Sequence, residues 1–126
     1  KNVRNLQKAM QIFQFGIESQ LYEYSWAILD VMKTNFRTAQ DRATIENLQA
    51  YKEFVLALNS NNLDQAIEKQ ELCCKLGNFY NLNILKTLYE IRLKQWIEQG
   101  KGAGDPQVVE MARKLRMVMQ GQNPMR

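Results

Sequence analysis

Apolar side chains recur at every third or fourth position along most of this chain. The longest run lies near the start and comprises Val3, Leu6, Met10, Phe13, Ile17, Leu21, Tyr24, Ile28 and Met32. This spacing matches the 3.6 residues per turn of an α-helix, so the side chains of such a run share one face. Because an apolar face is stable only when other helices cover it, the pattern predicts an all-α fold with a shared core.

The first run predicts a long N-terminal helix that is continuous or mildly bent, with a break near Gly16 as the alternative. Further apolar residues widen its face, namely Ile12, Phe15, Tyr22, Trp26, Leu29 and Val31. A face of this width needs neighbouring helices on two sides. This face is wider than a small domain can cover, which indicates that another subunit buries part of it.

Three shorter helices are predicted next. Asp41 and Thr44 are alternative N-caps for the first of them, and the polar run 59–62 is typical of the turn that ends it. Asn62 is then the predicted N-cap of the next helix, with Gln65 at the capping-box position. Gly77 is expected to end that helix, because glycine adopts the left-handed C-cap conformation at little cost. Together with the N-terminal helix these helices form the predicted bundle core, residues 1–99.

The end of the chain differs in composition from the core. Residues 100–104 have the glycine content of a flexible linker. Asp105 and Pro106 then supply an N-cap and a first-turn proline for a helix over residues 105–121, and residues 122–126 are expected to be loose. The predicted fold is one all-α domain, a four- to five-helix bundle whose last helix follows a Gly-rich linker.

The chain contains no histidine, which counts against catalysis. Histidine is the commonest general base and the usual partner of a serine or cysteine nucleophile. Two carboxylate pairs remain, Glu68 with Glu71 and Glu18 with Glu23, but both are typical of a solvated helix face. We therefore expect a protein that is not an enzyme, with no catalytic residue, no cofactor and no small-molecule substrate.

Cys73 and Cys74 are the only cysteines. Adjacent positions on a helix point about 100° apart, so we expect two reduced thiols rather than a disulfide. Without histidine they are an uncommon ligand set for zinc, and no metal site is predicted. No apolar run approaches the roughly 18 residues that a membrane-spanning helix needs. These features favour a cytoplasmic protein without a membrane partner.

The charge of the chain, +4 in total, is concentrated near its end. Residues 100–126 carry the cations Lys101, Arg113, Lys114, Arg116 and Arg126 against Asp105 and Glu110. Arg113 and Arg116 are three residues apart and so share a face of the predicted last helix, beside its apolar stripe. The same helix therefore offers an apolar surface and a basic one.

The apolar surface leads to our main hypothesis, a helical interaction subunit that serves as an assembly, adaptor or chaperone-like component of a larger complex. Its docking residues would be Val108, Met111, Ala112, Leu115 and Met119. Methionine side chains are flexible and suit adaptable apolar contacts. The partner would be another protein or further copies of this chain.

The basic surface leads to the alternative, a small subunit that binds a nucleic-acid backbone without sequence specificity inside a ribonucleoprotein-type complex. The phosphate contacts would come from Lys101, Arg113, Lys114 and Arg116. Phe15, Tyr22 and Trp26, predicted on one side of the first helix, would stack the bases of a single strand if exposed. Such a stripe of aromatic residues is more often part of a core.

Overall fold

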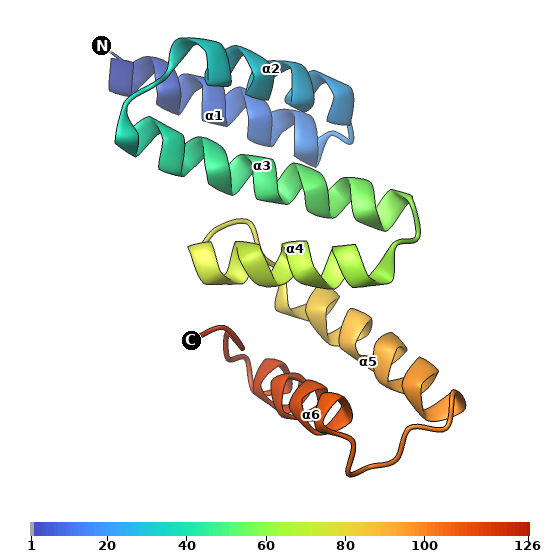
Figure 1. The fold of residues 1–126 in the computed structure, drawn as a ribbon. Helices are drawn as coiled ribbons and strands as arrows, with labels where there is room; N and C mark the ends of the chain where they lie inside the picture. Colours follow the sequence, from blue (N-terminus) through green and yellow to red (C-terminus); the bar gives the residue numbers. More distant parts are fainter. Residues whose placement is uncertain (1) are drawn as a thin grey trace. The chain divides into compact units, whose positions relative to one another are not determined.

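The computed structural model describes the backbone of residues 2–126 and the side chains from Leu6 onward, so Val3 lies outside the described side chains. Six helices occupy this part of the chain, and it contains no strand (Figure 1). They are α1 (Asn2–Glu18), α2 (Tyr22–Asn35), α3 (Ala39–Asn59), α4 (Leu63–Leu76), α5 (Leu82–Glu98) and α6 (Pro106–Met119). The all-α prediction is confirmed. None of the described helices is long and apolar enough to cross a membrane.

The contacts within the chain divide it into two compact units. Unit 1 is Lys1–Lys52 and unit 2 is Glu53–Arg126. The division falls inside α3. In unit 1 the side chains of Phe13, Leu29, Met32 and Leu48 have no exposed surface.

The predicted continuous N-terminal helix is wrong, because the chain reverses direction between α1 and α2. Gln20 adopts a left-handed backbone conformation with φ of 61°. The Leu21 N–H donates to the Gly16 carbonyl oxygen over 2.7 Å and closes the turn. The two helices then lie side by side and antiparallel (Figure 1). This division of one predicted helix into two brings the count to six.

Gly16 allows α1 and α2 to approach closely. A Cβ atom at this position would lie 2.1 Å from Ser25 Oγ and 3.2 Å from the Leu21 carbonyl oxygen. Ser25 is fully buried, and its hydroxyl donates a 2.7 Å hydrogen bond to the Phe13 carbonyl oxygen. The contact therefore requires a glycine on one helix and holds a small polar side chain on the other.

The start of α3 also differs from the prediction. Asp41 and Thr44 both lie inside the helix, which begins at Ala39. The Asp41 N–H donates to Thr38 Oγ1 over 3.0 Å, and the Thr38 N–H donates to the Asp41 carboxylate over 3.4 Å. Thr38 is therefore the N-cap of α3, and Asp41 occupies the third helical position. The two hydrogen bonds between these residues form the reciprocal arrangement of a capping box.

The caps predicted in unit 2 are confirmed. The Asn62 side chain accepts a hydrogen bond from the Gln65 N–H at the start of α4, and Gly77 ends that helix with φ of 86°. Asp105 caps α6 by accepting from the Gln107 N–H, with Pro106 in the first helical position. These signals are local, so the sequence alone was sufficient to find them.

The end of unit 2 is more ordered than the sequence suggested. The expected Gly-rich linker, residues 100–104, is a hydrogen-bonded turn in which the Lys101 N–H donates to the Trp96 carbonyl oxygen. The helices on its two sides, α5 and α6, pack against each other. The tail expected to be loose also makes contacts, because Pro124 is buried and the Asn123 side chain donates a 2.9 Å hydrogen bond to the Cys74 carbonyl oxygen.

Candidate functional site

The apolar face of α6, our predicted docking surface, packs largely inside unit 2. Val108 and Met111 are buried, and Ala112 and Leu115 are half-buried. Only Met119 of the five is open to solvent, with 62% of its surface exposed. The face is occupied because α6 packs on α5. Val108 and Met111 therefore cannot receive a partner unless α6 first leaves its place.

The cations proposed for nucleic-acid binding are mostly paired within the same unit. Lys101 Nζ lies 3.6 Å from the Asp105 carboxylate, and Arg113 donates two hydrogen bonds to Glu110. That guanidinium lowers the pKa of Glu110, chiefly through the hydrogen bond. Arg116 is exposed and takes part in none of the ion pairs that the described residues form.

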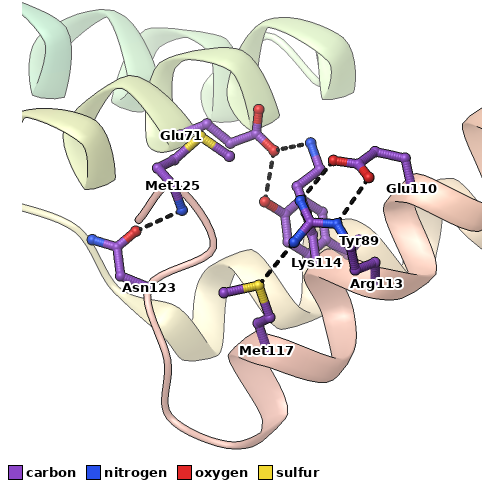
Figure 2. A network of polar contacts seen from close by, with 8 residues as sticks. All are labelled: Glu71, Tyr89, Glu110, Arg113, Lys114, Met117, Asn123 and Met125. Atoms are coloured by element: carbon purple, nitrogen blue, oxygen red, sulfur yellow. Dashed lines mark hydrogen bonds and ion pairs between the residues drawn. The ribbon is translucent and has the colours of Figure 1, made fainter.

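The fourth cation, Lys114, belongs to a network that joins three helices (Figure 2). Glu71 on α4 accepts a 2.6 Å hydrogen bond from the Tyr89 hydroxyl on α5 and a 2.7 Å hydrogen bond from Lys114 Nζ on α6. The ammonium also lies 5.7 Å from the centroid of the Tyr89 ring. The Lys114 side chain is only 14% exposed. Lys114 therefore stabilises unit 2 and presents little charge to a ligand.

Tyr89 is a neutral hydrogen-bond donor in this network. Its side chain has no exposed surface. Burial, followed by the hydrogen bond to Glu71, raises the pKa of Tyr89 well above its ordinary value. A tyrosine in this state holds its proton at any physiological pH, so the contact with Glu71 fixes the packing of α4 on α5.

The two thiols predicted to be reduced are free and fully buried. Burial raises the pKa of Cys73 to about 11, and burial together with the neighbouring Cys73 and Glu71 raises that of Cys74 to about 12. Because the thiolate is the reactive species, both side chains are poor nucleophiles and metal ligands near neutral pH. No cluster of three potential metal ligands occurs within the described part of the chain.

Iodoacetamide is expected to modify Cys73 and Cys74 of the native protein at least about tenfold more slowly than in the urea-unfolded chain at pH 8. The raised pKa values lower the thiolate fraction, and burial blocks the reagent. A time course followed by mass spectrometry measures both rates on the same preparation. Equal rates in the native and unfolded protein would contradict the burial of the two thiols.

An open hollow lies where α1 turns into α2, in unit 1. Its volume is about 560 Å³, and it is lined by Phe15, Gln20, Leu21, Tyr22, Glu23 and Tyr24. Three of these side chains are large, apolar and about half exposed, with exposed fractions of 59% for Phe15, 51% for Leu21 and 48% for Tyr24. We call this hollow, together with its lining residues, the hairpin hollow. Phe15 and Tyr24 are the two exposed aromatic side chains among the described residues of unit 1.

Sequence periodicity does not predict this site, because it places Leu21 and Tyr24 on the buried apolar face of one long helix. The turn at Gln20 instead separates Phe15 on α1 from Tyr22 and Trp26 on α2, so the three aromatic residues do not share one helix face. Tyr22 and Trp26 are half-buried and stack with their ring centroids 6.0 Å apart. Gly16 was the sequence signal for the turn, but the apolar periodicity favoured a continuous helix.

A second, smaller hollow lies within unit 2. Its volume is about 320 Å³, and it is lined by Ala57, Leu58, Asn61, Asn62, Leu63, Ala66, Leu88, Ile91 and Gln95. Leu58 and Ile91 are partly exposed, and no charged residue is among those that line it. It offers apolar contact but little chemical selectivity.

No protein-family model, curated protein or solved structure matches this chain. The surface features described above are therefore the basis for assigning it a role.

Proposed function

We propose that this chain is a non-enzymatic interaction subunit, an adaptor or assembly component that docks another protein on its hairpin hollow. One observation carries the proposal: Phe15, Leu21 and Tyr24 are each about half exposed and line the same hollow. Isolated exposed apolar residues are ordinary, whereas adjacent ones that form a concave surface mark sites of protein interaction. Covering these side chains would gain about 25 cal/mol for each Å² of apolar surface.

The packing of the two helices that form the hollow supports the same role. Ser25 and Gly16 hold the two helices in close contact, and Trp26 packs between Tyr22 and Phe13, with its ring centroid 5.9 Å from that of Phe13. A surface whose backbone is already fixed loses little conformational entropy when a partner binds. The hollow is thus suited to stable docking.

The nucleic-acid alternative has less support. Three of its four proposed cations are engaged with carboxylates in unit 2. The exposed aromatic residues at the hairpin hollow lie beside Glu23, and a carboxylate repels a phosphate backbone. Non-specific nucleic-acid binding requires a surface of unpaired Lys and Arg residues, and of the four proposed cations only Arg116 takes part in none of the ion pairs among the described residues.

Photocrosslinking tests the proposal. With p-benzoylphenylalanine in place of Tyr24, the protein is expected to form an adduct of one defined mass with another protein in its source cells. The same amino acid in place of Asp30, an exposed residue of α2, is the matched control. An adduct at position 24 that exceeds the one at position 30 and is lost on Phe15→Ala is the expected result. Equal adducts at both positions, or adducts with nucleic acid alone, would contradict the proposal.

A further inference from the structure

The chemistry of the hairpin hollow indicates what it accepts, if it docks a protein as proposed above. Aromatic residues and a carboxylate line it together: Phe15, Tyr22 and Tyr24 supply rings, and Glu23 supplies a negative charge. Glu18 ends α1 beside the same turn and is exposed. Neither carboxylate takes part in an ion pair among the described residues. Aromatic faces next to an unpaired carboxylate attract cations.

The neighbouring part of unit 1 already holds a cation on an aromatic ring. Lys52 Nζ lies 5.7 Å from the centroid of the Trp26 ring, and Trp26 stacks on Tyr22, which lines the hollow. This pair shows that the aromatic cluster already accommodates one cation. Phe15 and Tyr24, which line the hollow, are exposed, together with Glu23.

We propose that the hairpin hollow is a docking site for an arginine side chain of a partner protein, whose neighbouring apolar residues cover Phe15 and Leu21. Arginine fits better than lysine, because its planar guanidinium stacks on aromatic rings and donates paired hydrogen bonds to a carboxylate. The partner is therefore a protein segment in which an arginine is flanked by apolar residues. Charge complementarity excludes an acidic segment, since Glu18 and Glu23 would repel it.

A peptide titration tests this inference. The probe is a short amidated peptide with one arginine flanked by leucines on the same helical face, and its partner peptide carries neutral citrulline in place of arginine. Nuclear magnetic resonance of the ¹⁵N-labelled protein follows the amides of Tyr22, Glu23 and Tyr24 and the indole of Trp26. The arginine peptide is expected to shift these signals and to bind about tenfold more tightly than the citrulline peptide.

Two variants and a control sharpen the test. Glu23→Gln removes the charge, and Tyr24→Leu keeps apolar surface but removes the ring. Each is expected to weaken binding of the arginine peptide about threefold or more and to leave the citrulline peptide unaffected. Asp30→Asn, which removes an exposed charge elsewhere on α2, is expected to change neither. Retained dispersion of the amide spectrum shows that the variants are folded.

The outcomes separate this inference from the proposed function. Equal binding of the two peptides at the hairpin hollow would overturn the arginine preference and leave protein docking in place. Failure of both peptides to shift these signals, in a protein that still forms the adduct at position 24, would overturn the inference alone. Self-association in sedimentation velocity that is lost both on Tyr24→Leu and on Arg116→Ala would also overturn it, because the occupant of the hollow would then be a second copy of this chain.

Discussion

Replacing Glu71 with alanine is expected to lower the free energy of unfolding by about 3–5 kcal/mol, the usual cost of breaking a buried ion pair by removing one partner. The loss would leave the Lys114 ammonium without its carboxylate, although its side chain is only 14% exposed. It would also leave the buried Tyr89 hydroxyl without its acceptor. Urea denaturation followed by circular dichroism measures the change.

Three comparison variants identify the cause of this loss. Glu68→Ala removes an exposed carboxylate from the same helix and is expected to cost less than about 0.5 kcal/mol. Lys114→Met keeps the hydrogen bond between Tyr89 and Glu71 and fills the space of the lysine stem, so it should cost less than Glu71→Ala. Adding Lys114→Met to Glu71→Ala should restore part of the loss, because the unpaired ammonium is gone. A loss below about 1 kcal/mol for Glu71→Ala would place the network at a solvated surface.

Replacing Gly16 with alanine is expected to lower the free energy of unfolding by about 2–3 kcal/mol, because overpacking and a displaced buried hydroxyl outweigh the higher helix propensity of alanine. The new Cβ would lie 2.1 Å from Ser25 Oγ. The hydroxyl cannot rotate away without losing its hydrogen bond to the Phe13 carbonyl oxygen. Thermal and urea denaturation measure the loss, and near-ultraviolet circular dichroism reports on the neighbouring aromatic residues.

Alanine at Gly102 is the matched control for this substitution. A Cβ there would meet no atom within 4 Å, so little change in stability is expected. Combining Gly16→Ala with Ser25→Ala removes the closest clash and should recover a large part of the loss. If Gly16→Ala instead stabilises the protein, as helix propensity alone would suggest, then α1 and α2 are not in close contact at this position.

Local signals in the sequence predicted the ends of several helices, but periodicity could not predict the turn between α1 and α2. Asn62, Gly77 and Asp105 act through backbone groups within four residues, so their effects can be read from a short stretch of sequence. The apolar spacing, by contrast, continues without interruption from Ile17 to Tyr24. The residue that turns the chain is Gln20, whose left-handed conformation is uncommon outside glycine and asparagine.

The candidate sites show the same limit. The spacing of Val108, Ala112, Leu115 and Met119 predicted the apolar face of α6, of which Met119 is exposed. It could not reveal that α5 of the same chain packs on this helix. The ion pair between Lys114 and Glu71 joins residues 43 positions apart, so no local sequence pattern predicts it. The hairpin hollow was missed for a related reason, since Leu21 and Tyr24 are exposed only because the chain turns beside them.

Glu71, the shared acceptor of the three-helix network, also affects how unit 2 unfolds. One carboxylate on α4 serves a donor on α5 and another on α6. Fraying of α4 would leave both the Tyr89 hydroxyl and the Lys114 ammonium without their acceptor, whereas fraying of α5 or α6 would remove one of the two donors to Glu71. A buried polar group that loses its partner carries a desolvation cost. We therefore expect the three segments to unfold together as one cooperative unit.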